Sequence, residues 1–418
     1  MQIPPSSIRP LLKKLLSRGL EAVDARAAVG RAISRDGAEL IIGGRRYDLR
    51  RYERVVVVGA GKATAPMARA VEQRLGRRLQ GGFVVVKHGH GLPTKRIVVA
   101  EAGHPVPDRS GQRAAARLSA MVAELGRRDL LIVLLSGGAS SLLPAPVAGI
   151  TLADKQRTTE KLLRSGATIS EINTVRKHLS RIKGGRLAEL TKATVVTLIL
   201  SDVLGDDLSA IASGPTVPDP TTYQDAVAIL KRYRIWQAVP QRVRQYLDRG
   251  CQGLASETPK PGSVLFRRVR HHIVGNSATA VTAVTRAAGE AGLRTLVQTP
   301  ALTGEAREAG KRFGSMARNI VREGKPLQRP CCVVAGGETT VTVTGKGTGG
   351  RAQEFAAAAA LEIAGLAKVW VVAIGTDGTD GPTDAAGAVI DGNTVARAQR
   401  LGVDLDHALK RNNTYPAL

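Results

Sequence analysis

The sequence has few cysteines and no long hydrophobic run, and each shortage excludes a class of protein. Its three cysteines, Cys251, Cys331 and Cys332, are too few for a disulfide framework and lack the spacing of a usual zinc site. No apolar run approaches the roughly 20 residues that a helix needs to cross a bilayer. The N-terminus has no uncharged core of the signal-peptide type. We therefore expect a cytoplasmic protein with no membrane partner.

Aromatic residues are also scarce, and this scarcity bears on the strong positive charge. The chain has 61 Lys and Arg residues against 35 Asp and Glu residues, a net charge of +26 that raises the question of nucleic-acid binding. Aromatic residues make up only 3% of the chain, which leaves few rings for base stacking, and no RNA-binding motif is present. We expect no nucleic-acid partner and interpret the charge as an arginine-rich surface that favours small anions.

The length and the hydrophobic pattern predict two α/β domains. A chain of 418 residues exceeds the usual size of one core. Continuous apolar runs such as VVVV and LLIVLL alternate with helical segments, which predicts largely parallel sheets flanked by helices, with an active-site cleft between the domains. We expect a Rossmann-like N-terminal domain at 1–256, a proline-rich linker at 257–263 and a C-terminal domain at 264–418.

The most unusual stretch is GGETTVTVTGKGTGGRAQEF, which begins at Gly336. Threonine alternating with valine from Thr339 to Thr344 predicts a strand. The glycines that follow allow backbone N–H groups to approach a ligand, and Arg351 opens a predicted helix. The stretch therefore predicts an anion-binding loop at a helix N-terminus. A mobile glycine hairpin is the alternative.

A second glycine loop, Gly59-Ala60-Gly61-Lys62, follows the strand VVVV. It completes no dinucleotide fingerprint, because Thr64 stands at the third glycine position and the next strand ends at Lys87, where an acid would be needed. It completes no nucleoside-triphosphate loop either. Lys62 at a helix start is nevertheless well placed to meet a phosphate, although a surface lysine after a tight turn is the alternative.

A third loop, Ser136–Ser141 with the sequence SGGASS, follows LLIVLL. Small residues and hydroxyls at a helix N-terminus can hold a carboxylate or phosphate, whereas a plain helix cap would need only one serine. Downstream, the predicted helix INTVRKHLSRIKGG carries Arg176 and Lys177. Most of its basic residues fit a solvated helix face, which is the usual meaning of such a run.

Two acidic loops complement these basic residues. Asp202 and Asp206 follow the strand TLIL, and Asp377 and Asp380 follow VWVVAI. Carboxylates at strand ends suit magnesium, which binds one or two of them together with phosphate oxygens and water. Asp-Gly turns are the alternative. Anion-binding loops, cations and carboxylates without a covalent nucleophile favour phosphoryl transfer.

Taken together, the motifs resemble those of the glycerate 2-kinases, a two-domain family whose C-terminal part is called MOFRL. The resemblance covers nearly the whole chain in the family's order and rests on the strings GAGKA, EAGHPVPD, LLSGGASSLLPAP, INTVRKHLSRIKGG, SDVLGDDLSAIASGPTVPD, ETPKPG, GGETTVTVTGKGTGGRAQEF and TDGTDGPTDAAGAVID. It implies ATP-dependent phosphorylation of D-glycerate to 2-phospho-D-glycerate with Mg²⁺. It also implies that the C-terminal domain is MOFRL-like.

The resemblance assigns catalytic roles to Lys62 and Arg351, which would neutralise charge on the transferred phosphoryl group. Asp377 would assist the metal or orient the hydroxyl. We expect the metal at Asp202, Asp206 and Asp380. The predicted nucleotide-binding residues are Gly59, Gly61, Gly336, Gly337, Glu338, Thr339, Gly345, Lys346, Gly347, Gly349 and Gly350. The predicted glycerate-binding residues, inferred from chemistry alone, are Ser136, Gly137, Gly138, Ser140, Ser141, Arg176 and Lys177.

Two alternatives and one departure accompany this prediction. Relatives named hydroxypyruvate reductases suggest an NAD(P)H-dependent reductase, which the missing third glycine and missing ribose acid disfavour. The other alternative is a catalytically silent protein that binds small anions. The family usually continues beyond the region corresponding to 412–418 into a threonine- and glycine-rich tail. The sequence leaves a homodimer open.

Overall fold

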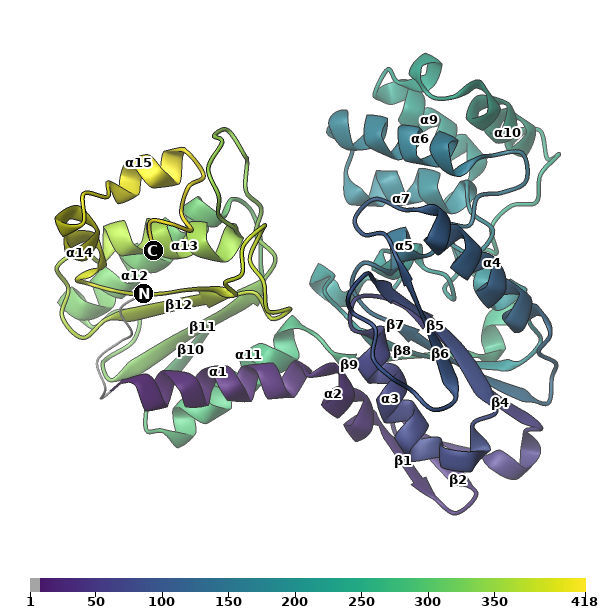
Figure 1. Cartoon of the computed structure of the whole chain (residues 1–418), viewed down its shortest axis with the longest axis horizontal. Helices are drawn as coiled ribbons and strands as arrows, with labels where there is room; N and C mark the ends of the chain where they lie inside the picture. The colour runs from purple at the N-terminus through teal and green to yellow at the C-terminus, as the bar shows by residue number, and fades with distance from the viewer. Residues whose placement is uncertain (1–7) are drawn as a thin grey trace. The chain divides into compact units, whose positions relative to one another are not determined.

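The computed structural model describes residues 8–418, and the chain divides into two compact units (Figure 1). The larger unit is Val23–Asn276; the smaller one contains Ser277–Leu418 together with residues 8–22. This division into compact units falls after Asn276, whereas the sequence led us to expect a linker at 257–263. The strand Val269–Gly275, which follows the predicted linker, pairs with a strand of the larger unit, so the chain leaves that unit only after Asn276.

The centre of the larger unit is a parallel sheet, which confirms the α/β prediction. Its strands are β4 (Arg54–Ala60), β5 (Gly81–Lys87), β6 (Ile97–Ala102), β7 (Asp129–Leu135), β8 (Thr194–Leu200) and β9 (Val269–Gly275). Every neighbouring pair is parallel, in the order β6-β5-β4-β7-β8-β9. The first strand of this sheet along the chain, β4, lies in the middle. The next two, β5 and β6, are added on one side of it, and β7, β8 and β9 are added on the other side. The order of the strands reverses between β4 and β7.

Helices cover both faces of this sheet because its strands are apolar on both sides. Successive valines of β4 point to opposite faces: Val55 and Val57 pack in one core cluster, and Val56 and Val58 pack in another. The first cluster includes residues of α2 (Ala25–Ala32), α3 (Thr64–Leu75) and the antiparallel strands β1 (Ile33–Asp36), β2 (Glu39–Ile42) and β3 (Arg45–Asp48). The second includes α4 (Arg109–Ala123), α5 (Ala139–Leu142) and α8 (Arg186–Glu189).

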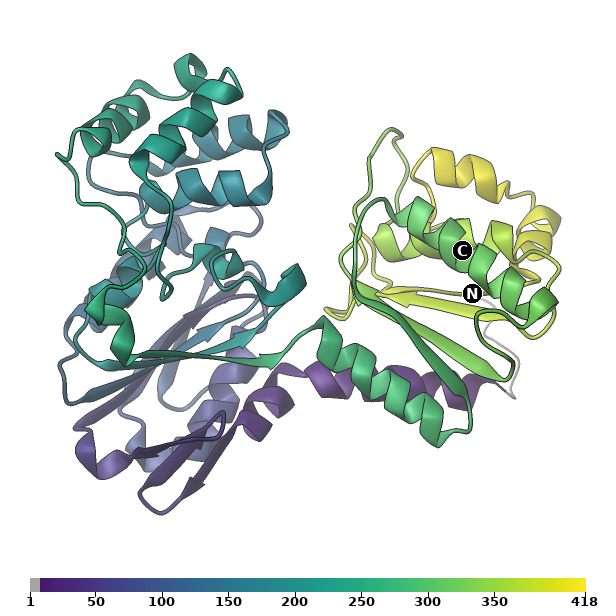
Figure 2. The same cartoon turned by 180° about the vertical axis from the view of Figure 1, so that it is seen from behind.

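A group of helices packs into a separate apolar cluster at one end of the larger unit, as Figures 1 and 2 show. These are α6 (Leu152–Arg164), α7 (Ile169–His178), α9 (Tyr223–Arg232) and α10 (Gln241–Cys251). Three of them begin at a threonine whose side chain and a carboxylate three residues later exchange hydrogen bonds with the backbone, in the pairs Thr151–Asp154, Thr168–Glu171 and Thr222–Asp225. The sequence therefore fixes where these helices start.

The smaller unit has two separate strand pairs. Its elements are α1 (Arg9–Val23), α11 (Ser277–Glu290), β10 (Arg294–Leu302), α12 (Ala306–Glu323), β11 (Cys331–Gly337), α13 (Arg351–Glu362), β12 (Trp370–Ile374), β13 (Gly387–Asp391), α14 (Thr394–Arg400) and α15 (Leu405–Lys410). The pair β10–β11 is parallel and the pair β12–β13 is antiparallel. The core includes the alanine-rich helix α13, which packs closely against α12.

One predicted strand is absent. In the segment Thr339–Thr344, Thr340 forms only an isolated bridge with Glu305, and Val343 is 71% exposed. The N–H group of Thr342 donates to the Glu305 carboxylate at 3.1 Å instead of to a neighbouring strand. Side-chain acceptors therefore take backbone donors that a strand would have used. Among residues 8–418, no helix combines the length and apolarity needed to cross a membrane.

Candidate active site

The site in the larger unit is built where the strand order reverses. Ligands of open parallel sheets gather at the carboxyl ends of the strands at such a reversal. The GAGK loop (Gly59–Lys62) follows β4 and the serine loop (Ser136–Ser141) follows β7, and these are the two strands on either side of the reversal. The topology therefore brings together two of the loops that the sequence singled out.

The two loops pack directly on each other. The N–H group of Lys62 donates to the carbonyl oxygen of Gly137 at 2.9 Å, and that of Ala63 donates to the Ser136 hydroxyl at 3.1 Å. Gly61 has φ +139°, and a Cβ there would lie 2.1 Å from the Ser136 hydroxyl oxygen. The glycine is thus required by the close approach of the serine loop. We expected it to face a nucleotide instead.

Side chains from two further loops meet the serine loop. A Cβ on Gly138 would lie 2.7 Å from the His104 ring and 3.5 Å from Cγ of Lys62. A Cβ on Gly137 would lie 2.2 Å from the carboxylate of Asp202. Burial and then the positive charge of Lys62 lower the pKa of His104, which favours the neutral imidazole at pH 7. A lysine, a neutral histidine and a carboxylate therefore surround one glycine turn.

The other end of the serine loop carries a buried polar network. The Lys183 ammonium group donates to the carbonyl and hydroxyl oxygens of Ser140, both at 2.9 Å. The Ser140 hydroxyl lies 3.0 Å from that of Ser213, which donates to Asn173 at 3.0 Å. We did not predict His104 from the sequence, and we assigned Lys183 no role. The only available signals were the EAGHPVPD and RIKGG strings that carry the family resemblance.

The two basic residues of α7 differ in their surroundings. Lys177 is buried and pairs with the buried Asp219 carboxylate at 3.3 Å. Asp219 also accepts hydrogen bonds from Thr221 and Thr258, so the pair fastens the segment that we had interpreted as a linker. Lys177 therefore has a structural contact, and its predicted contact with glycerate stays a prediction. Arg176 is partly buried and forms no ion pair with any residue between 8 and 418.

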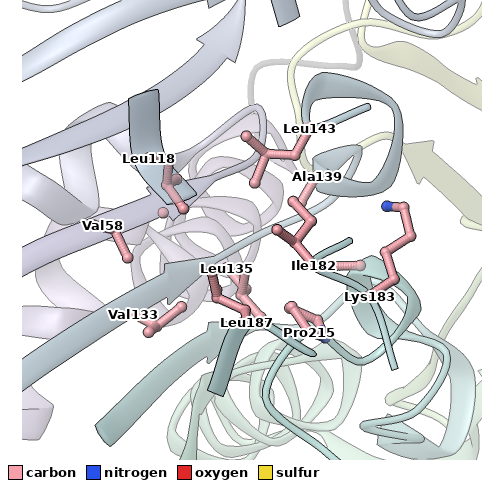
Figure 3. Close-up of a pocket in the computed structure, with 12 residues that line it drawn as sticks. Val58, Leu118, Val133, Leu135, Ala139, Leu143, Ile182, Lys183, Leu187 and Pro215 are labelled. Carbon is pink, nitrogen blue, oxygen red and sulfur yellow. The ribbon is translucent and has the colours of Figure 1, made fainter. Parts of the chain in front are cut away.

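A small cavity of about 10 Å³ lies beside this network (Figure 3). Apolar side chains such as Val58, Val133 and Leu187 line most of it. Figure 3 shows the Lys183 side chain with its nitrogen at the end away from Val58 and Val133. A space of this size holds at most about one water molecule, so the cavity is a packing defect and not the substrate site.

In the smaller unit, the glycine loop (Gly345–Gly350) packs against the segment 411–415. Cβ atoms on Gly345 and Gly347 would lie 2.1 Å from the Arg411 carbonyl oxygen and 2.4 Å from the Asn413 Cβ. The Asn412 side chain accepts from the N–H group of Gly345, and the Arg411 carbonyl accepts from that of Gly347. These two N–H groups, which we predicted to face phosphates, donate to acceptors of the protein itself. Cβ atoms on Gly349 and Gly350 would lie 2.3 Å from the Thr414 hydroxyl oxygen and 2.3 Å from the Asp380 carboxyl carbon, and Lys346 lies in the same loop.

The start of α13 holds the predicted catalytic arginine. Arg351 donates to the carboxylate of Glu338 at 2.6 Å, and both side chains are partly exposed. Glu338 and Thr339 directly follow β11, whose last residues, Gly336 and Gly337, lie close to Ser277 and Leu302. The structure therefore brings Arg351 to the carboxyl end of β11, beside the residues that the sequence predicted around it.

The four predicted acidic residues lie in different settings. Both oxygens of Asp380 accept backbone N–H groups of α13, from Ala352 at 3.0 Å and Gln353 at 2.8 Å, which makes Asp380 a buried cap of this helix. The metal role that we predicted for Asp380 stays a prediction. Asp206 accepts from the Asn276 amide at 2.5 Å. Within the described part of the chain, no group of three or more acidic, histidine or cysteine side chains forms a preassembled metal site.

Comparisons with known proteins identify relatives of this arrangement. The chain matches the model named "Domain of unknown function (DUF4147)" over residues 11–248 and the MOFRL family model over residues 331–418. The glycerate 2-kinase of Pyrococcus horikoshii is 42% identical over 98% of this chain and 92% of its own length. The D-glycerate 2-kinase of Thermotoga maritima is 40% identical over 99% of this chain and 93% of its own length.

Two further comparisons add a solved structure and a different name. A crystal structure of the Thermotoga maritima glycerate kinase matches with a TM-score of 0.86 at 40% identity, covering 99% of this chain and 94% of that one. A protein of Agrobacterium vitis named putative hydroxypyruvate reductase is 45% identical over 87% of this chain and 82% of its own length. The similarity therefore extends through both units of the chain.

Proposed function

Because the chain belongs to the glycerate 2-kinase family, with DUF4147 and MOFRL regions, we propose that it phosphorylates D-glycerate at its 2-hydroxyl with ATP. The γ-phosphoryl group leaves ADP, the hydroxyl oxygen forms the new P–O bond and loses its proton, and 2-phospho-D-glycerate is released. The observation that carries the proposal is the position of Lys62 beside the serine loop, at the reversal of the strand order.

Lys62 and Arg351 supply the positive charge in this proposal. Phosphoryl transfer depends mainly on positioning and on stabilising negative charge, so a lysine and an arginine suffice without a covalent nucleophile. Both residues lie at carboxyl ends of parallel strands, after β4 and shortly after β11. The proposal requires both cations to reach the same γ-phosphoryl group.

The Mg²⁺ in this proposal is held mainly by ATP. Magnesium takes one or two protein carboxylates and completes its octahedral shell with substrate phosphates and water. The carboxylate of Asp202, which packs on the Gly137 backbone, fits this requirement, and Asp206 follows in the same loop. When bound, the ion neutralises charge on the phosphates. Asp377 orients the acceptor hydroxyl or assists the ion.

The experiment is a product analysis with a competing assay. Phosphorus NMR of the product from ATP and D-glycerate distinguishes 2-phosphoglycerate from 3-phosphoglycerate. Oxidation of NADH or NADPH by hydroxypyruvate tests the reductase alternative, which the Agrobacterium vitis name raises. Formation of 3-phosphoglycerate, or cofactor oxidation without phosphoryl transfer, would refute the proposal. Absence of both reactions would favour the remaining alternative, a catalytically silent anion-binding protein.

A further inference from the structure

Three basic side chains beyond the serine loop have no carboxylate partner in the part of the chain that the structure describes. Lys155 of α6 is 7% exposed, and its ammonium group has no hydrogen-bond partner among the described residues. Arg176 of α7 is partly buried and has no ion pair within residues 8–418. Lys183 is 3% exposed, and within residues 8–418 its ammonium group donates hydrogen bonds only to the neutral oxygens of Ser140. We call these three residues the cation cluster.

The three charges act on one another electrostatically. Burial and then the charge of Arg176 lower the pKa of Lys155 to about 7. Burial, then Lys155 and Arg176, lower the pKa of Lys183 well below its usual value. No carboxylate in the described part of the chain opposes these effects. The cluster is therefore a buried region of positive potential with no negative partner among residues 8–418.

Other buried charges of this chain do have such partners. Lys177, one residue after Arg176, pairs with Asp219, and the buried Glu354 pairs with Arg307 at 3.1 Å. Burying an uncompensated charge is costly, so unpaired buried cations persist where something other than stability requires them. An anionic ligand would supply the missing charge.

We propose that the cation cluster binds the carboxylate of the acceptor at Ser140 and so determines the specificity for 2-hydroxy acids over neutral alcohols. This inference rests on the proposed function of the same site. Ser140 is two residues from Gly138, so their Cα atoms are at most ~7 Å apart. Gly138 adjoins Lys62 and His104. The carboxylate of a 2-hydroxy acid is bonded to the carbon that bears the hydroxyl, so this placement directs the hydroxyl towards Lys62.

The first test is the substitution Lys155→Met, which removes the charge but keeps the length of the side chain. We expect KM for D-glycerate to rise about 10- to 100-fold with kcat changed much less, as for the loss of one charged hydrogen bond. The melting temperature should not fall, because an apolar group replaces an unpaired buried cation. The control is Arg157→Met, which removes an exposed charge from the same helix. An unchanged KM in Lys155→Met overturns the proposal.

The second test measures binding without ATP, so that it holds even if the chain proves not to be a kinase. Isothermal titration calorimetry with D-glycerate, lactate, glycerol and inorganic phosphate separates carboxylates from a neutral alcohol and from another anion. We expect the wild type to bind D-glycerate and lactate but not glycerol, and Lys155→Met to bind both carboxylates more weakly. Equal binding of glycerol, no binding of carboxylates, or a loss confined to phosphate would each overturn the assignment.

Discussion

The guanidinium group of Arg351 donates to the carboxylate of Glu338 at 2.6 Å, at the point where β11 has ended and α13 begins. Both side chains are about half exposed, so the ion pair contributes little to the stability of the unit. A pair of this kind keeps the arginine in one orientation beside the end of the strand. The charge of Arg351 is therefore available to a phosphate at a small energetic cost.

The substitution Arg351→Ala should lower kcat by about 10³-fold or more, the scale on which a transferring phosphoryl group depends on an arginine. The melting temperature should stay close to that of the wild type, because the side chain is partly exposed. A coupled ADP-release assay measures the rate, with Arg322→Ala as the control, an exposed arginine of α12. Near-wild-type turnover in Arg351→Ala would remove this residue from the chemistry.

Lys62→Ala should also lower turnover by orders of magnitude while the protein remains folded. If both cations act on one phosphoryl group, the double variant should lose less than the product of the two single losses, because residues that act as a unit are not additive. Steady-state kinetics of the four proteins measures the coupling. Strictly multiplicative losses would argue that the two residues act on separate groups.

Asn412 should stabilise the glycine loop. Its side-chain oxygen accepts from the N–H groups of Thr344 and Gly345, and its amide donates to the buried Glu354 at 2.5 Å. Asn412→Ala removes these bonds and also places alanine at φ +53°, so it should cost about 2 kcal/mol or more. Asn412→Gly separates the two causes, because glycine tolerates this φ. Hydrogen exchange of residues 344–348 measures the effect, and unchanged protection in both variants would contradict it.

The stability of the larger unit should depend on pH through Lys155. Its folded pKa of about 7 lies below the ordinary value of 10.5, so between these values the unfolded chain holds a proton that the folded protein has released. Stability therefore rises with pH across this window as far as Lys155 is concerned. The advantage in melting temperature of Lys155→Met over the wild type should shrink from pH 7 to pH 10. A constant difference would contradict the buried, unpaired state of this lysine.

Asp202→Asn should raise the Mg²⁺ concentration needed for half-maximal activity, because one hard oxygen ligand becomes neutral. Asp380→Asn should instead lower the stability of the smaller unit, since its carboxylate caps α13. Magnesium titrations and thermal melts of both variants separate the two roles. An unchanged titration for Asp202→Asn would exclude this residue from the metal.

The sequence by itself determined the elements that depend on local chemistry. Apolar runs with no alternation predicted strands buried on both faces, as β4 and β7 are, and threonine followed three residues later by a carboxylate fixed the start of α6. The motifs also predicted Lys62, Arg351 and the serine loop as site residues. The strand predictions are confirmed because they rest on neighbours in the chain, whereas the site roles of Lys62, Arg351 and the serine loop stay predictions.

The tertiary structure decided which groups have partners. The segment Thr339–Thr344 has the pattern of a strand, but Glu305 and Asn412 take its backbone donors. Lys177 was predicted to contact glycerate and Lys155 was given no role, yet one meets Asp219 and the other meets no acid among the described residues. Burial and pairing depend on residues far away in the chain, which periodicity and spacing do not encode. For this reason the cation cluster emerged only from the fold.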